Sequence, residues 1–134
     1  ALRVTKTGTR WTTAPAWRND DVAMYMSSPA VSGTAIYGLS TKNRGQFFAI
    51  DAASGKTMWL TRGREAENAS IVRAADYLLL ATTNSELVGA KANPARFEEV
   101  KRYTVAESAM WANPAFAGRT IIVKDVNNLI AWSF

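Results

Sequence analysis

The chain has 134 residues, enough for one domain with a hydrophobic core, and its apolar content of 48% excludes a disordered protein. It contains no cysteine and no histidine, which excludes disulfides, thiolate metal sites and histidine-based catalysis, so no enzyme activity is expected. The net charge is +5, but four of the 16 basic residues lie in the first 18 positions and the remainder is nearly balanced, which argues against nucleic-acid binding.

The first 26 residues predict two strands joined by a short turn. The strands cover Leu2–Thr5 and Thr9–Trp17, and the turn is Lys6-Thr7-Gly8. Ala1 and Trp11 lie near the positions that an alanine and a tryptophan hold in the next repeat. We therefore interpret residues 1–26 as the end of a preceding structural unit.

Residues 27–63 predict four strands and contain the clearest hairpin of the chain, at positions 49–59. Gly55 can adopt the positive φ that a tight turn requires, and Asp51 is expected to accept hydrogen bonds from backbone N–H groups of that turn. A catalytic or metal-binding role for Asp51 is the weaker alternative, because no second ligand is near it in sequence. The predicted strands are Pro29–Ser32, Thr34–Ser40, Gln46–Asp51 and Lys56–Arg62.

Residues 64–106 predict four further strands, but the tight glycine turn is replaced by Asn93-Pro94. We expect Ala90 to occupy the place of Ala49. Glu98 and Glu99 suggest a catalytic pair of carboxylates, but the side chains of neighbouring residues on a strand point to opposite faces of the sheet. The predicted strands are Ile71–Ala74, Tyr77–Thr83, Glu86–Ala92 and Phe97–Val105.

Residues 107–134 predict only three strands, at Pro114–Ala117, Thr120–Asp125 and Leu129–Phe134. A three-stranded final unit exposes a row of unpaired backbone groups.

The three segments repeat one another. Similar stretches begin at Ser28, Ser70 and Asn113, with offsets of 42 and 43 residues. A period of about 40–50 residues with four short strands is typical of β-propeller blades. The predicted fold is therefore all-β, made of four-stranded antiparallel blades that form a partial propeller or half-ring. The expected blades are 27–63, 64–106 and the incomplete 107–134.

Together, Ser28-Pro29, Gln46 through Trp59 and Asn113-Pro114 resemble the pyrroloquinoline-quinone-like β-propeller repeat family. The resemblance implies a structural docking motif in which the tryptophan of one blade packs on the alanine–glycine region of its neighbour. The residues of this motif are Ala49, Asp51, Gly55 and Trp59. Dehydrogenases of the family bind a quinone and calcium, but no ligand set for them is matched here, so no cofactor or metal is expected.

The resemblance also implies a function. Its non-catalytic members are scaffolds, such as the lipoprotein subunit of the bacterial outer-membrane barrel-assembly machinery, so we expect a protein-interaction scaffold in the periplasm or elsewhere outside the cytoplasm. A fragment of a quinone-dependent dehydrogenase and a carbohydrate-recognising propeller are the alternatives.

The partner is expected to be a protein, with no nucleic acid and no transmembrane segment, because no apolar run is long enough to cross a bilayer. Self-association is a further expectation, in which two copies complete a six-bladed ring by pairing Thr9–Trp17 with Leu129–Phe134. A larger parent chain that supplies the missing blades is the alternative.

Overall fold

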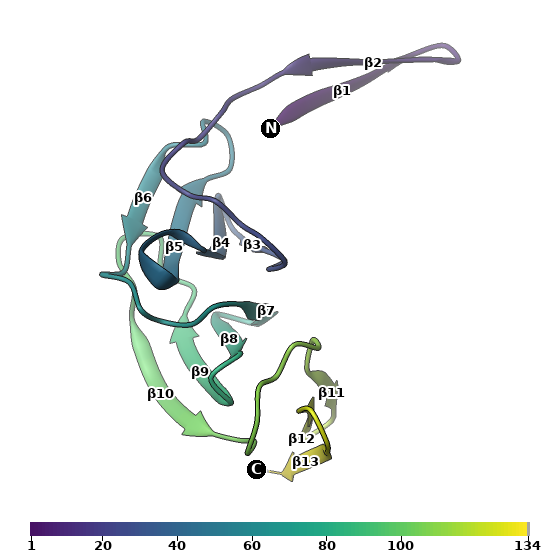
Figure 1. Ribbon diagram of the computed structural model, residues 1–134. Helices are drawn as coiled ribbons and strands as arrows, with labels where there is room; N and C mark the ends of the chain where they lie inside the picture. Colours follow the sequence, from purple (N-terminus) through teal and green to yellow (C-terminus); the bar gives the residue numbers. More distant parts are fainter. Residues whose placement is uncertain (134) are drawn as a thin grey trace.

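Four antiparallel sheets follow one another along an arc in the computed structural model, which describes residues 1–133 (Figure 1). The described residues contain no α-helix, and their one helical turn is the 3₁₀ segment η1 (Lys42–Arg44). The sequence-based prediction of an all-β fold built from partial propeller blades is thereby confirmed. Phe134, which was placed in the last predicted strand, lies outside the described residues.

Two four-stranded sheets form the middle of the arc, and their strands follow each other in chain order. The first full sheet contains β3 (Ala30–Ser32), β4 (Ala35–Ser40), β5 (Gln46–Asp51) and β6 (Thr57–Leu60). The second full sheet contains β7 (Ala69–Ala74), β8 (Tyr77–Thr82), β9 (Glu86–Lys91) and β10 (Glu99–Thr104).

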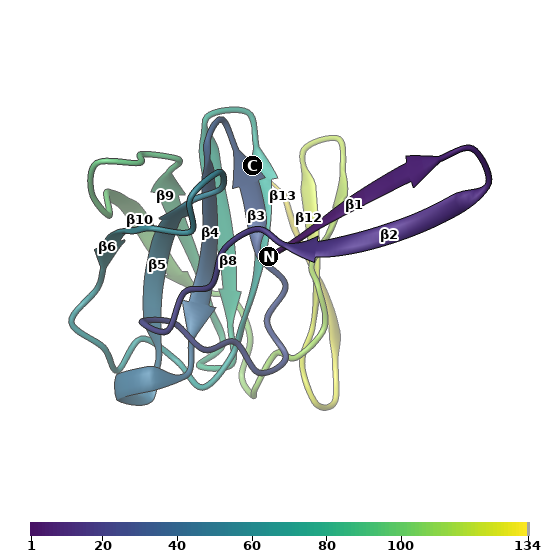
Figure 2. The same cartoon turned by 90° about the horizontal axis from the view of Figure 1, so that it is seen from above.

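The two ends of the arc are less complete. The C-terminal sheet has three strands, β11 (Ala115–Ala117), β12 (Thr120–Lys124) and β13 (Leu129–Ser133), so β13 is an edge strand of the described chain. The N-terminal arm is a hairpin of β1 (Leu2–Thr7) and β2 (Arg10–Pro15). This arm projects from the arc, and its strands cross the direction of the sheet strands at a steep angle (Figure 2).

As in the N-terminal arm, where Gly8 has φ +61°, the first hairpin of each of the other three sheets has a two-residue turn whose first residue has a positive φ. That residue is Gly33 (+60°), Ala75 (+52°) and Gly118 (+59°) in the three sheets. Glycine adopts this conformation without steric cost, whereas Ala75 does so against its preference. The shared turn aligns the sheets residue by residue, with Ala35 of β4 matching Tyr77 of β8.

This alignment corrects one expected correspondence. Tyr37 pairs with Ala49 in the first full sheet, and the matching Leu79 pairs with Gly89 in the second. Gly89, and not Ala90, is therefore the structural counterpart of Ala49. The reason is that the loop between the second and third strands is two residues shorter in the second sheet, since Leu39 pairs with Phe47 but Ala81 pairs with Leu87.

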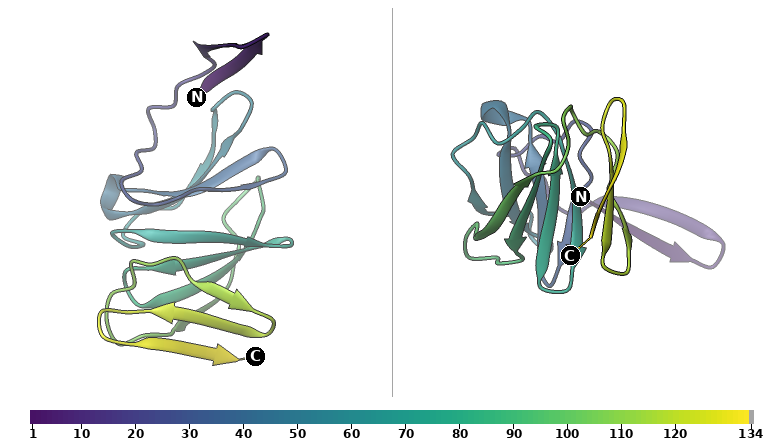
Figure 3. Two further views of the ribbon diagram at one scale, coloured as in Figure 1. Left: turned by 90° about the vertical axis from the view of Figure 1, so that its right-hand side faces the viewer. Right: turned by 90° about the horizontal axis from the view of Figure 1, so that it is seen from below.

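Two hydrophobic cores lie between the sheets. The first joins the full sheets and contains Tyr37, Leu39 and Phe47 from one side and Leu78, Leu80 and Val88 from the other. The second joins the second full sheet to the C-terminal sheet and is built from aliphatic side chains such as Leu87, Ile121 and Val123. The sheets thus stack face to face around the arc, as the left view of Figure 3 shows.

Gly38 in the centre of β4 is required by a close contact with its cross-strand partner. Phe48 of β5 pairs with Gly38 and is fully buried, and its ring covers the glycine. A Cβ added at Gly38 would lie 2.3 Å from Cζ of Phe48.

We expect the Gly38→Ala substitution to lower the free energy of unfolding by about 1–3 kcal/mol, because a buried ring must move to admit the methyl group. The matched control is Gly89→Ala in β9, where an added Cβ would meet only the carbonyl oxygen of Lys101 at an ordinary 3.7 Å. Urea titration measures both. Equal stability of the two variants would contradict the close contact of Gly38 and Phe48.

Candidate functional site

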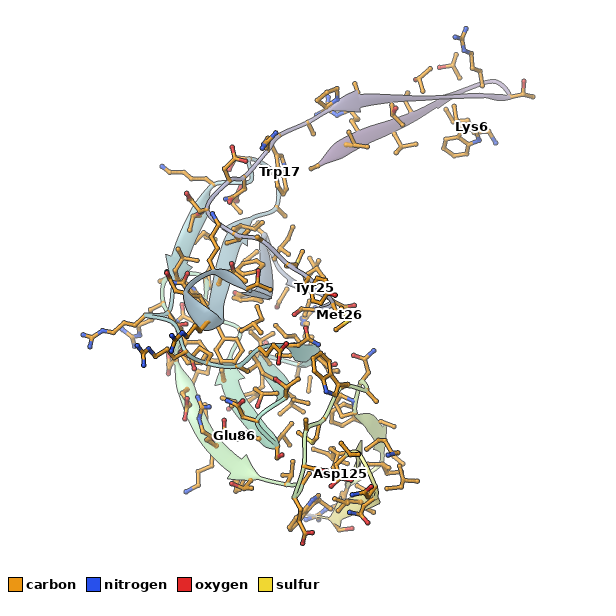
Figure 4. All side chains as sticks on the ribbon, viewed as in Figure 1. Lys6, Trp17, Tyr25, Met26, Glu86 and Asp125 are labelled. Atoms are coloured by element: carbon orange, nitrogen blue, oxygen red, sulfur yellow. The ribbon has the colours of Figure 1, made fainter. Side chains whose placement is uncertain are left out.

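Trp17 joins the N-terminal arm to the first full sheet (Figure 4). Its indole N–H donates to the carbonyl of Ala52 at 3.0 Å. Its ring covers Gly55, where an added Cβ would lie 2.2 Å from a ring carbon, and Gly55 also has φ +73°. Asn19 strengthens the junction by donating to the Gly55 carbonyl at 2.6 Å. Both the backbone angle and the covering ring therefore require glycine at position 55.

Trp59 makes the corresponding contact one sheet further along the arc. Its indole N–H donates to the carbonyl of Asn93 at 2.9 Å, in the loop between β9 and β10. The centroid of its ring lies 6.0 Å from the ring centroid of Tyr37 and 5.7 Å from that of Phe97. Phe97 in turn stacks on Phe47 at 5.4 Å. Four aromatic rings thus fill the outer part of the interface between the full sheets.

The expectation that Trp11 is the counterpart of Trp59 is wrong, because Trp17 makes the matching contact. Trp11 is 63% exposed, and its ring contacts the ammonium group of Lys6 at 5.2 Å. The sequence contained the correct signal, since Trp17 precedes Trp59 by the same 42 residues that separate the first two repeats. The prediction selected Trp11 because it compared the distances from Ala1 to Trp11 and from Ala49 to Trp59, and not the spacing between the tryptophans.

Trp132 makes a contact in the opposite direction, which no repeat pattern indicated. It lies on β13, and its indole N–H donates back to the carbonyl of Val105 at 2.9 Å, just after β10. It therefore connects the C-terminal sheet to the preceding sheet. The third strands of the other sheets have no tryptophan, so comparison of the repeats could not identify this one.

Asp51 organises the turn that Trp17 covers. One of its carboxylate oxygens accepts hydrogen bonds from the backbone N–H of Ser54 at 2.7 Å and from the Ser54 hydroxyl at 2.6 Å. These bonds lower the pKa of the Asp51 carboxyl below its ordinary value, because they favour the charged form. The geometry is that of a turn.

Asp125 has the same kind of role between β12 and β13. Its carboxylate accepts the backbone N–H groups of Asn127 at 2.9 Å and Asn128 at 2.6 Å. The Asn128 bond is the largest cause of a pKa lowered to about 2. The sequence analysis placed Asp125 at the end of a predicted strand without assigning it a function, and the structure shows it as the residue that orders the loop after β12.

Three basic side chains form ion pairs with glutamates in and beside the second full sheet. Arg102 on β10 lies 2.8 Å from a carboxylate oxygen of Glu86, 2.9 Å from Glu99 and 3.4 Å from Glu65. These carboxylates raise the pKa of the guanidinium, chiefly through the Glu99 bond. Glu98 instead pairs with Lys91 at 2.6 Å and with Arg96 at 3.6 Å. The adjacent glutamates thus have separate basic partners and form no catalytic pair.

Neither a metal site nor a membrane helix emerges from the part of the chain that the structure describes. Residues 1–133 hold no group of three or more acidic, histidine or cysteine side chains that could bind a metal ion. Within the same residues, Asp20 pairs with Arg18 at 2.6 Å and Asp21 accepts a hydrogen bond from Thr57 at 2.6 Å. No helix among them has the length and apolar character needed to cross a bilayer.

An apolar cavity of about 540 Å³ lies between the second full sheet and the C-terminal sheet. We call it the C-terminal cavity, and its main walls are Leu79, Leu87, Gly89, Tyr103, Val105 and Trp132. A second hollow runs along β13 itself and is lined by residues 104–107 and 128–132. The edge strand of the arc is thus flanked by unfilled space.

No family model matches the chain, and no curated protein matches it. Among solved structures the chain is similar to BamB from Moraxella catarrhalis, with a TM-score of 0.56 and 14% sequence identity over 75% of this chain. The match covers 29% of the BamB chain, so this chain corresponds to under a third of it. At this identity the likeness shows a β-propeller-type fold and does not show family membership.

Two computationally designed proteins are also similar. Ika4 has a TM-score of 0.49 and 8% identity, over 90% of this chain and 98% of its own. Ika8 has a TM-score of 0.44 and 7% identity, over 81% of this chain and 45% of its own.

We expect Trp59→Ala to lower the free energy of unfolding by about 3 kcal/mol, because it removes a hydrogen bond and two ring contacts from an interface between sheets. The matched control is Trp11→Ala, which removes an exposed ring and should change stability by no more than about 0.5 kcal/mol. Denaturant unfolding followed by circular dichroism measures both. A Trp59→Ala protein as stable as the Trp11→Ala protein would contradict the structural role of Trp59.

Proposed function

We propose that this chain is a non-catalytic β-propeller repeat domain that acts as a protein-interaction scaffold. The observation that carries the proposal is the exposure of large apolar side chains at both ends of the arc. In the N-terminal arm these are Leu2, Val4 and Trp11, and on β13 Leu129 is 74% exposed. Clustered exposed apolar residues are typical of surfaces that bind other proteins.

The internal contacts support the same proposal by giving the scaffold its rigidity. We assign Ala49, Asp51, Gly55 and Trp59 to a docking motif that holds neighbouring blades together, with Trp17 as its N-terminal equivalent. Asp51 shapes the turn, Gly55 accepts the covering ring, and Ala49 pairs with Trp59 across the sheet. The proposed units are the end of a blade at 1–26, full blades at 27–63 and 64–106, and a three-stranded last blade at 107–134.

We place this function in the bacterial cell envelope, on the periplasmic or another extracytoplasmic side. The support is the fold likeness to BamB, together with the resemblance of Gln46 through Trp59 to a repeat of envelope proteins. Self-association into a six-bladed ring is a narrower form of the proposal. It is the less favoured form, because β2 ends at Pro15, which has no N–H to donate to another strand, before it reaches the predicted end at Trp17.

Site-specific photo-crosslinking in the bacterium that encodes the chain tests the scaffold role. A photoreactive residue in place of Leu129 should give a discrete crosslink to an envelope protein, because this position is exposed on the apolar end of the arc. The same residue in place of Lys56, on the exposed turn before β6, is the control and should give none. Failure to crosslink from Leu129, Val4 and Trp11 alike would contradict the proposal.

Light scattering and calcium titration of the purified chain separate the alternatives. A scaffold that binds a different protein should behave as a monomer of 14.6 kDa. Excess calcium should leave its melting temperature unchanged, because a ligand that binds only the folded state must stabilise it. A stable dimer would favour the six-bladed ring, and a calcium-dependent rise in melting temperature with quinone absorbance would favour the dehydrogenase.

A further inference from the structure

Three arginines line one hollow at the end of the first full sheet. The hollow has a volume of about 410 Å³ and is bounded by Asn43, Arg44, Arg62, Gly63 and Arg64. Its two sides are η1, in the loop between β4 and β5, and the start of the segment that joins β6 to β7. All three arginines are exposed, and together they are called the arginine cluster.

Backbone and side-chain contacts hold the two loops of the cluster against each other. The carbonyl of Asn43 accepts the backbone N–H of Arg64 at 3.0 Å. A Cβ added at Gly63 would lie 2.6 Å from the same carbonyl oxygen. The buried side chain of Gln46 donates to the carbonyl of Thr61 at 2.6 Å and accepts a hydrogen bond from the Asn43 amide at 3.0 Å. The backbones that carry the arginines therefore have fixed relative positions.

Two of the arginines adopt a backbone conformation that arginine disfavours. Arg44 has φ +62° and Arg64 has φ +68°. Glycine and asparagine adopt a positive φ more readily, so turn geometry by itself does not favour arginine at either position. Residues held in sparsely populated backbone conformations concentrate at functional sites. The turn geometry therefore leaves the choice of arginine at both positions to be explained by its side chain.

The second full sheet closes the equivalent hairpin without these features. Its loop between the second and third strands is two residues shorter and consists of residues 83–85, which include no basic residue. The residue that matches Gln46 is Glu86, whose carboxylate lies 2.8 Å from Arg102. The fold therefore does not require the longer loop that carries Arg44.

The positive charges of the cluster are not neutralised within residues 1–133. None of the three arginines forms an ion pair with a described residue. Glu65 follows the last of them in sequence, but its carboxylate lies 3.4 Å from Arg102. Glu67 is exposed and lines an adjoining hollow with Arg44. Unpaired like charges on two fixed loops repel one another and attract an anionic ligand.

The use of the backbone decides which anion the cluster suits. A phosphate site of the backbone type needs free N–H groups that converge on the ligand. Here the N–H groups of Gly45, Arg64 and Glu65 already donate to carbonyls within the two loops. Binding then depends on guanidinium groups around an open hollow, and each of them can hold one carboxylate through two parallel hydrogen bonds. This arrangement fits a run of carboxylates better than a single phosphate group.

The cluster lies in the interior of the arc and at the ends of strands. On one side of the first full sheet, the carbonyl of Ala23 accepts the backbone N–H of Thr41, next to η1. On the other side, the second full sheet shares a hydrophobic core with it. Because sheets of this kind stack face to face, a further sheet of the same chain would extend the arc and leave the arginines uncovered.

We propose that the arginine cluster binds an acidic segment of a partner protein. Neighbouring glutamate or aspartate side chains of that segment meet the guanidinium groups of Arg44, Arg62 and Arg64. The proposal rests on the scaffold role and names for it a binding surface and a class of partner. The surface is distinct from the apolar ends of the arc.

A fluorescent oligoglutamate peptide is the probe, titrated with the full chain at low ionic strength and followed by anisotropy. Arg44→Gln, Arg62→Gln and Arg64→Gln should each weaken binding about two- to fivefold, because each removes one charge-assisted pair. Arg3→Gln in the N-terminal arm is the matched control. It removes the same charge from an exposed arginine and should change the affinity by less than about 1.5-fold. An oligoglutamine peptide should not bind.

Stability measurements separate a binding role from a structural one. Arg64→Asn removes a charge and introduces a residue that tolerates a positive φ, so it should raise the melting temperature while weakening oligoglutamate binding. A lower melting temperature would give Arg64 a structural role and overturn its place in the site. Arg44→Lys keeps the charge but lacks the planar guanidinium, so it should bind more weakly than the parent and more tightly than Arg44→Gln.

Three results would overturn the proposal. The first is no oligoglutamate binding at low ionic strength, and the second is a loss in Arg3→Gln equal to that in the cluster variants. The third is arginine-dependent binding of inorganic phosphate or of phosphatidylglycerol vesicles that is tighter than oligoglutamate binding, because the cluster would then be a site for phosphate groups.

The scaffold role and the arginine cluster can fail separately. If oligoglutamate does not bind but Leu129 still crosslinks to an envelope protein, the scaffold role stands and the cluster is not its binding surface. If oligoglutamate binds through the arginines but no crosslink forms from the ends of the arc, the site stands without the proposed cellular role.

Discussion

The structure depends on the packing of one sheet face on the next. A single four-stranded sheet with two apolar faces is not stable in water by itself, so each sheet of the arc relies on its neighbours. Trp17 and Trp59 make this dependence specific, because each donates its indole N–H to a carbonyl in the turn or loop that follows the third strand of the next sheet. A hydrogen bond at the outer rim and apolar contact behind it together fix the angle between successive sheets.

The same constraint explains why the two interfaces are unequal. The first interface has an aromatic cluster around Tyr37, Phe47 and Trp59 at its rim, and the second has leucines and a glycine at the matching positions. Trp132 partly compensates by donating back to the Val105 carbonyl. The C-terminal sheet is therefore anchored at one point of its rim and leaves a cavity beside it.

The repeat spacing predicted nearly all of the fold, because strand alternation and turn residues are local properties that the chain displays directly. It did not predict which residue of the second full sheet corresponds to Ala49. A loop two residues shorter in that sheet moves Gly89 into the matching position. It predicted a docking tryptophan in the first unit but selected Trp11, because exposure cannot be read from spacing. The contact of Trp132 and the cavity depend on packing between sheets, and the ion pairs of Arg102 depend on strand register, so none of them could be predicted from one sequence.

An arc of stacked sheets differs from a closed ring in one respect that bears on function. The two full sheets bury one core between them and the second full sheet shares another with the C-terminal sheet, whereas the outer strands β6, β10 and β13 each pair on one side only within the described residues. Such groups are costly in water, and the N-terminal arm and β13 present them together with exposed side chains such as Trp11 and Leu129. The exposed apolar side chains of the N-terminal arm and of β13 therefore lie at opposite ends of an arc whose packed cores connect the sheets between them.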